Sequence, residues 1–386
     1  MPDRLPQAAP LPGDAICLHI GIHKTGTTAL QSAFASARGD LAAQDVLYPG
    51  RRSAHHGPAM SVLGRPWGWA QRGGEMSDPA VFDRLAREAR RHPGRVLISS
   101  EQFCEADDQG AARVVAGLGA DRTHVVIALR SLGQLLPSSW QQYLKYGQTM
   151  AYVKWLRTVL DPAYDGRVTP TFWRRNDHGA LVARWAGLLG PDRVTVLIVD
   201  DVAPEAIFHT FAEMLDIEPG VLLARRETGT NRSMTAAESE FLRRLNRDVG
   251  KELSWQDYEA LVRGQVVAGM LSRAAPPEEP RLATPAWALD AAAQRGSASV
   301  AQIRRSGVRV LGDLEALGRR IDAGPPVQGD TADQLPMDAA DQLPMDAALA
   351  ITRAQVRAGA GRARGRRTRR AARQVRSRLS RALPRR

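Results

Sequence analysis

Short apolar runs alternate with amphipathic segments through the first 215 residues of the chain. Each run is nearly continuous in Val, Ile and Leu, which is typical of strands buried on both faces of a parallel sheet. We expect strands at 16–20, 95–99, 123–129 and 194–199. Apolar residues at helical spacing predict helices at 27–37, 81–91, 133–146, 178–189 and 204–215. This alternation favours an α/β fold, with helices flanking a parallel sheet.

The remainder of the chain carries fewer periodic signals. A helix is expected from Thr235, because Thr235 and Glu238 have the spacing of a capping box ahead of an apolar run. Pro276–Pro280 is typical of a linker, and the segment DQLPMDAA at 333–340 is repeated at 341–348, which favours a duplicated linker. We predict a disordered leader (1–13), an α/β domain (14–270), a helical and linker extension (271–351) and a tail (352–386).

The net charge of +12 is concentrated at the C-terminus. Residues 352–386 contain fourteen arginines and no Asp, Glu or Lys, so subtracting them from +12 leaves about −2 for the rest of the chain. We expect this basic tail to be disordered, and an anionic membrane surface is the partner that it suggests. Aromatic residues are absent from it, so we do not expect a nucleic-acid binder that works by base stacking.

Cysteine usage and the N-terminus bear on the cellular setting. Cys17 and Cys104 are the two cysteines, and neither belongs to a CxxC pair or a His/Cys cluster, so we expect neither a disulfide framework nor a zinc site. The proline- and alanine-rich start does not resemble a signal peptide, and no apolar run approaches the roughly 18 residues of a membrane span. We therefore predict a cytoplasmic protein, peripheral to the membrane if the tail binds it.

A glycine-bearing loop lies between the first strand and the first helix. Gly21 and Gly26 have the spacing of a GxxxxG phosphate loop, whose backbone N–H groups and following helix N-terminus bind phosphate oxygens. The triphosphatase loop would continue with lysine, but Thr27 occupies that position and Lys24 lies inside the loop. This displacement argues against ATP as the ligand. The alternative is a turn whose glycines serve only the backbone.

The segment from His23 to Gln31, HKTGTTALQ, resembles the 5′-phosphosulfate loop of bacterial sulfotransferases that use 3′-phosphoadenosine-5′-phosphosulfate (PAPS). The resemblance implies a P-loop-like parallel sheet and no metal. It also implies that Lys24 contacts the phosphosulfate and stabilises the departing bridging oxygen. The loop residues that would bind the nucleotide are His23, Lys24, Thr25, Gly26, Thr27 and Thr28.

A PAPS enzyme also needs a site for the 3′-phosphate. Arg130 ends the third strand, and Ser138 follows Pro137, which suits the first turn of a helix, so the pair can hold one phosphate. The sulfotransferase family has an arginine and a serine at this spacing in its 3′-phosphate motif. Without that resemblance, Arg130 would be interpreted as a surface charge at the end of a strand. Arg232, in Thr230–Ser233, is a third candidate for the nucleotide, with a plain polar turn as its alternative. In the sulfotransferase family this region has a basic residue next to a glycine, and that pair is not evident in this sequence.

Sulfuryl transfer to an alcohol requires a base for the hydroxyl proton. Glu101 follows the second strand and is our candidate, because carboxyl ends of neighbouring parallel strands face one crevice. Its alternative role is to cap the next helix. His55 and His56 are competing bases, in a loop that we expect to be polar and exposed. Trp67 and Trp69 follow downstream and are candidates to line the acceptor pocket.

Together these motifs predict a sulfotransferase that moves a sulfuryl group from PAPS to a hydroxyl of an acceptor such as a glycan, a lipid-linked sugar or a small alcohol. One alternative is an ATP-dependent kinase with an atypical phosphate loop, for which Asp200 and Asp201 would end the fourth strand. Another is a protein that binds anions or nucleic acid through the basic tail.

Overall fold

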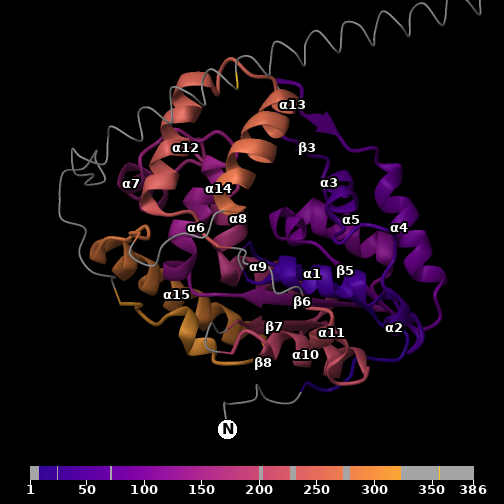
Figure 1. Ribbon diagram of the computed structural model, residues 1–386. Helices are drawn as coiled ribbons and strands as arrows, with labels where there is room; N and C mark the ends of the chain where they lie inside the picture. Colours follow the sequence, from indigo (N-terminus) through magenta and orange to yellow (C-terminus); the bar gives the residue numbers. More distant parts are fainter. Residues whose placement is uncertain are drawn as a thin grey trace, which may run out of the picture.

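The computed structural model centres on a six-stranded parallel sheet with the order β2-β5-β1-β6-β7-β8 (Figure 1). The structure describes residues 8–322 except 24, 70–71, 200–202, 227–231 and 273–278, and in addition residue 356. The strands are β2 (Val46–Leu47), β5 (Arg95–Ser99), β1 (Ile16–Gly21), β6 (Thr123–Leu129), β7 (Val194–Ile198) and β8 (Arg309–Leu311). A separate hairpin pairs β3 (Pro66–Trp67) with β4 (Glu75–Met76).

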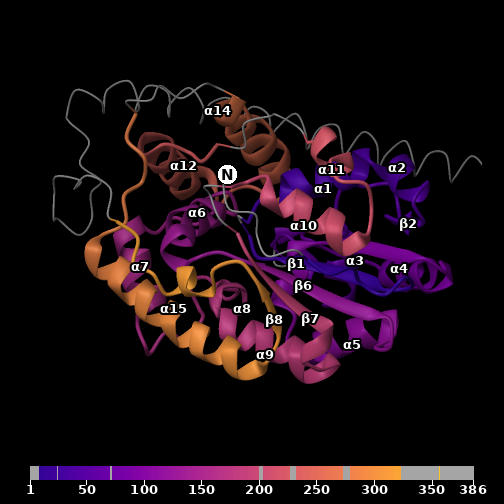
Figure 2. The same cartoon turned by 90° about the horizontal axis from the view of Figure 1, so that it is seen from below.

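Helices cover both faces of the sheet, so the expected α/β fold with a P-loop-like parallel sheet is confirmed (Figure 2). Side chains of β1 alternate between the two apolar layers, as Leu18 packs on one face and Cys17 on the other. The first layer includes α4 (Ala80–Arg91), α5 (Asp108–Leu118) and α9 (His178–Leu189). The second includes α1 (Thr27–Ser36) and α10 (Ala206–Leu215).

A third apolar cluster joins helices beside the sheet. It includes side chains of α6 (Leu132–Leu144), α7 (Tyr152–Leu160), α12 (Ala236–Val249), α13 (Trp255–Tyr258), a π-helical segment (Glu259–Val267) and α14 (Ala268–Ser272), with further residues from the helices that contain Phe172 and Ala288. The capping box predicted at Thr235 is confirmed, with Glu238 Oε2 accepting from the Thr235 N–H at 3.0 Å. No helix in the part of the chain that the structure describes has the length and apolarity to cross a membrane.

The last strand comes from the segment assigned to the extension. Helix α15 (Ala286–Ser306) packs on α9 and α6, and β8 follows it and pairs with β7. The shorter helices are α2 (Arg38–Ala42), α3 (His56–Val62), α8 (Phe172–Asn176) and α11 (Val221–Ala224), with 3₁₀ turns at Glu101–Glu105, Pro191–Arg193 and Leu314–Leu317. The DQLPMDAA repeat lies outside the described residues, as does the tail apart from Val356.

Candidate functional site

The candidate site lies at the carboxyl ends of three adjacent strands. β1 runs between β5 and β6, and the chain goes from β5 to β6 by crossing over β1, so the connections reverse direction here. In open α/β sheets this is where ligand crevices form. Gly21 ends β1 beside Ala128 of β6, while Glu101 and Arg130 follow the two neighbouring strands. The strand order therefore brings the three sequence motifs to one edge of the sheet.

The phosphate loop turns directly from β1 into α1. Gly26 has a φ of 76°, the left-handed conformation that favours glycine, and α1 begins at Thr27. The first N–H groups of a helix lack intrahelical partners, and no acidic side chain in the first turn of α1 offsets their positive end. Both features favour an anion as the ligand of this loop. Lys24 lies outside the described residues.

Close packing inside the loop explains its small residues. A Cβ on Gly21 would lie 2.1 Å from the Thr27 methyl carbon and 3.2 Å from His19 Nε2. Thr25 is buried and its hydroxyl donates to the Ile22 carbonyl at 2.8 Å, so that hydroxyl braces the loop.

The other predicted loop residues differ in exposure. Thr27 is buried, His23 is half-buried, and Gly26 and Thr28 are exposed. Thr28 therefore offers its hydroxyl to solvent at the first turn of α1, whereas Thr27 packs into the loop.

Glu101 is held from two sides. Gln31 of α1 donates from Nε2 to Glu101 Oε2 and to Ser99 Oγ, both at 3.2 Å. The other carboxylate oxygen, Oε1, lies 3.7 Å from His56 Nε2. The alternative role of Glu101 as a helix cap is wrong, because Ser100 is the N-cap of the 3₁₀ turn and accepts from Gln102 N at 3.2 Å. The carboxylate is left to face Gln31 and His56.

Sequence reasoning missed the functional positions of Gln31 and His19. Gln31 is buried and links the helix of the phosphate loop to the candidate base. His19 lies inside β1, where Nδ1 is 2.8 Å from Ser99 Oγ and burial lowers its pKa to about 3. The sequence signal for His19 was a polar residue within an otherwise apolar strand. His19 is therefore neutral beneath the loop at ordinary pH.

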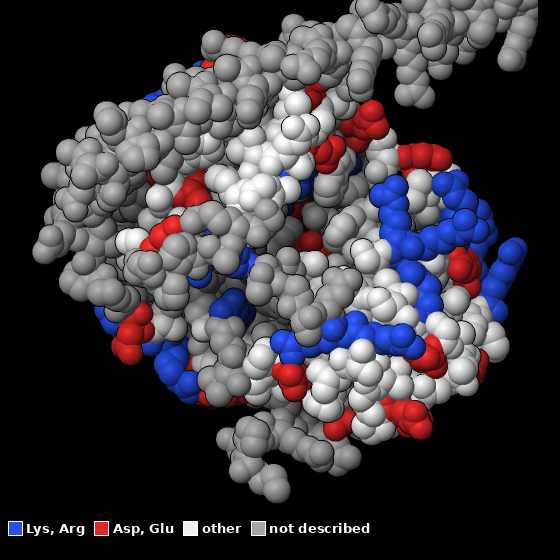
Figure 3. Space-filling view, viewed as in Figure 1, with Lys and Arg blue, Asp and Glu red and all other residues white. Residues whose placement is uncertain are grey.

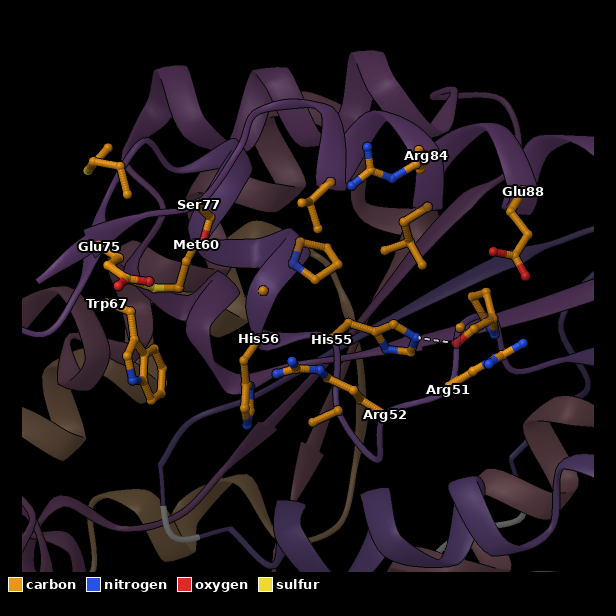
Figure 4. Close-up of a pocket in the computed structure, with 18 of the residues that line it drawn as sticks. Arg51, Arg52, His55, His56, Met60, Trp67, Glu75, Ser77, Arg84 and Glu88 are labelled. Carbon is orange, nitrogen blue, oxygen red and sulfur yellow. Dashed lines mark hydrogen bonds between the residues drawn. The ribbon is translucent and has the colours of Figure 1, made fainter. Parts of the chain in front are cut away.

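The two adjacent histidines occupy different environments, and the expected exposed loop is wrong. His55 is buried as the N-cap of α3, its Nε2 is 2.9 Å from the Pro49 carbonyl oxygen, and burial lowers its pKa (Figure 4). His56 begins α3, and its Nδ1 is 2.9 Å from Ser100 Oγ. Its ring stacks on Trp67 with centroids 6.5 Å apart and an interplanar angle of 15°. His56 alone of the pair faces Glu101.

A cavity of about 740 Å³ opens next to His56 (Figure 4). Its wall includes the rings of Trp67 and Trp255, the apolar side chains of Met60 and Leu85, and charged side chains of both signs. The charged residues are Arg51, Arg52, Arg84, Glu75, Glu88 and Glu259. This volume falls in the range of small-molecule sites, which is roughly 300–1,000 Å³. Trp67 lines this cavity, whereas Trp69 is absent from its wall and packs against Trp255 and Tyr258.

Arg130 and Ser138 are arranged differently from the expected pair. Arg130 is half-buried and donates from Nε to Gln134 Oε1 at 3.3 Å. Helix α6 begins at Leu132, so Pro137 lies inside it rather than in its first turn, and the Ser138 hydroxyl donates to the Leu135 carbonyl at 3.0 Å. The expectation of Ser138 at a helix N-terminus is thus wrong. Ser131 is the N-cap and lies directly after Arg130.

Arg232 is engaged in a structural contact. Its Nη1 and Nη2 donate to the two oxygens of Glu238 at 2.7 and 2.8 Å, and both side chains are close to nine-tenths buried. Glu238 in turn caps α12. The proposed nucleotide contact of Arg232 would compete with this bidentate ion pair, so we leave Arg232 out of the site.

Comparisons with known proteins add little beyond this geometry. No family model and no curated protein matches the chain. A solved structure described as a sulfotransferase from Alicyclobacillus acidocaldarius matches at 17% identity, over 67% of this chain and 98% of that chain, with a TM-score of 0.39. A likeness at this level carries no argument about activity, so function is argued from the site.

Proposed function

We propose that the protein is a sulfotransferase that uses PAPS as donor and a hydroxyl-bearing compound as acceptor. The observation that carries the proposal is the Gln31 bridge between α1, which starts at the phosphate loop, and Glu101, which faces the cavity-lining His56. A chain of contacts therefore runs from the helix of the loop through Gln31 and Glu101 to His56 at the cavity wall. An in-line transfer needs this order: donor phosphate, acceptor oxygen, base.

The nucleotide would bind across the carboxyl ends of β1 and β6. The helix N-terminus at Thr27, with Lys24 as the resemblance implies, would bind the 5′-phosphosulfate. Arg130, beside the N-terminus of α6, would bind the 3′-phosphate. Ser138 stays a prediction; its hydroxyl would first have to give up the Leu135 carbonyl.

The acceptor hydroxyl would lie between Glu101 and His56. An oxygen about 2.8 Å from both Glu101 Oε1 and His56 Nε2 fits the 3.7 Å gap between these two atoms. The hydroxyl oxygen attacks sulfur, the bond from sulfur to the bridging phosphate oxygen breaks, and the hydroxyl proton passes to Glu101. His56 positions the oxygen, and Ser100 orients the His56 ring. Gln31 holds Glu101 Oε2, which fixes Oε1 toward the acceptor.

The proposal is tested with PAPS labelled in its sulfuryl group. The full chain is incubated with pooled glycans, lipid-linked sugars and small alcohols, and label is followed into each acceptor class. Glu101→Gln should slow transfer by roughly 10²–10⁴-fold without weakening nucleotide binding. Glu218→Gln, an exposed carboxylate away from this edge, is the matched control. Label that never leaves PAPS, or transfer that Glu101→Gln leaves unchanged, would contradict the proposed reaction.

A further inference from the structure

Five arginines run from the cavity along the outer surface of α4, and we call them the arginine stripe. Arg51 and Arg52 line the cavity from the loop before α3, and Arg84 lines it from α4. Arg87 and Arg91 follow at spacings of three and four residues on α4, so they share a helix face with Arg84. Figure 3 shows Lys and Arg side chains gathered over this side of the molecule.

The arginines of the stripe form few ion pairs, although Glu75, Glu88 and Glu259 also line the cavity. In the part of the chain that the structure describes, Arg51, Arg52, Arg87 and Arg91 are exposed and form no ion pair. Arg84 has one contact, 3.9 Å to the exposed Asp78. The other carboxylates on α4 are Asp83 and Glu88, neither of which pairs with the stripe. Unpaired guanidinium groups in a row attract a ligand with several anionic groups.

The stripe is longer than the cavity. Arg87 and Arg91 lie beyond its wall, and a rise of 1.5 Å per residue places Arg91 about 10 Å along α4 from Arg84. An acceptor that filled the cavity alone would leave these two charges unused. The stripe therefore suits a chain-like acceptor of which one unit enters the cavity.

The cavity wall favours a sugar as that unit. The indole of Trp67 is fixed by its stacking on His56 and by donating from Nε1 to Glu259 Oε1 at 2.9 Å. The part of the indole that lines the cavity and is not covered by His56 is therefore a preset apolar platform for a ring. An acidic sugar also carries hydroxyl and carboxylate on the same unit. It can thus place a hydroxyl at Glu101 while its neighbours in the chain contact the stripe.

We propose that the acceptor is a carboxylate-bearing oligosaccharide, bound along the arginine stripe with one ring against Trp67. This inference rests on the proposed function for its reaction, but its binding site is separate from the donor site. A nucleic acid fits less well, because a base could stack on Trp67 in the cavity but further bases would find no aromatic ring along the stripe. The exposed large apolar side chains in the described residues are Met76, Leu188 and Trp287, and none belongs to the stripe.

Binding of tetragalacturonate to the full chain, measured by calorimetry, tests the proposal. Neutral maltotetraose, tetraglutamate and a short single-stranded DNA are the comparison ligands. The variant Arg87→Glu/Arg91→Glu lies outside the cavity and the catalytic groups, and Arg157→Glu/Arg305→Glu reverses two exposed charges elsewhere. The C-terminal arginines are present in every variant, so any binding of anions to them is the same in each titration.

We expect tetragalacturonate to bind more tightly than each comparison ligand and to lose about tenfold in affinity in the stripe variant, with no change in the control. Trp67→Ala should weaken tetragalacturonate and leave tetraglutamate unchanged. Equal binding of maltotetraose, tighter binding of peptide or DNA, or equal losses in the two double variants would overturn the proposal. Each variant is also titrated with adenosine 3′,5′-bisphosphate, so that a loss of donor binding can be told apart from a loss of oligosaccharide binding.

Discussion

The substitution Gly21→Ala tests whether the loop after β1 is a phosphate site. Gly21 does not have a left-handed φ, so alanine strains no torsion, and the obstacle is space alone. The added Cβ would lie 2.1 Å from the Thr27 methyl carbon, whereas carbon atoms in contact lie about 3.5–4.0 Å apart. The Thr27 methyl group must therefore move by about 1.5 Å, and Thr27 is the first residue of α1.

Two magnitudes follow from that displacement. Overpacking costs about 1–3 kcal/mol of unfolding free energy. Hydrogen bonds from the helix N-terminus to phosphate tolerate only a few tenths of an ångström, since N–H···O distances span about 2.7–3.2 Å. Loss of one such charge-assisted bond weakens binding by about 1.5–3 kcal/mol, or roughly 10–100-fold in Kd.

Urea unfolding and calorimetric titration with adenosine 3′,5′-bisphosphate measure these two effects on the same samples. Gly39→Ala is the control, because Gly39 lies in α2 with nothing within 4 Å of its added Cβ, and helix propensity predicts stabilisation of about 0.5–1 kcal/mol with unchanged binding. A Gly21→Ala protein that is folded and binds the bisphosphate as tightly as the parent would refute the assignment of this loop.

Three further predictions concern stability. Glu105→Gln should lower the free energy of unfolding in urea by about 3–5 kcal/mol, because the buried carboxylate contacts two arginines that would lose their partner. The control Glu315→Gln removes an exposed ion pair and should cost under about 1 kcal/mol. Equal costs in the two variants would contradict this prediction. Arg232→Ala should destabilise the protein, because the buried Glu238 carboxylate would lose its ion pair, and it should leave the affinity for the bisphosphate unchanged. A variant with unchanged stability and weaker bisphosphate binding would restore Arg232 to the nucleotide site. Burial lowers the pKa of His178 to about 4, so from pH 7 to pH 5 the unfolded state takes up a proton that the native state does not, and stability falls by about 2 kcal/mol. His178→Gln should remove that part of the acid sensitivity, and an unchanged pH dependence would contradict it.

The sheet was predictable because its signals are local. The strands at 95–99 and 123–129 coincide with β5 and β6, since continuous apolar runs next to turn residues need no tertiary information. β8 was missed because it is three residues long and includes a polar Arg309. Its place in the sheet comes from pairing with β7, more than 100 residues earlier, which no local pattern encodes.

The candidate site was predictable in its positions and not in its contacts. The phosphate loop and Glu101 follow from strand ends, and the strand order brings them together. Gln31 reaches Glu101 across 70 residues of sequence, so its role depends on how α1 lies over β5. Ser138 was misplaced because proline was read as a first-turn residue, whereas α6 starts five residues earlier and contains it. The ion pair of Arg232 with Glu238 could not be predicted from the local pattern, because Glu238 was identified only as the capping residue of α12.

We propose that the residues at the carboxyl end of β1 bind a 3′,5′-phosphorylated adenosine without a metal. Calorimetric titration of the full chain with adenosine 3′,5′-bisphosphate, beside ATP with magnesium, tests it most directly. We predict tight, magnesium-independent binding of the bisphosphate, weakened roughly 10–100-fold by Arg130→Ala and by Lys24→Ala. Preference for ATP with magnesium, or bisphosphate binding that neither substitution weakens, would contradict it.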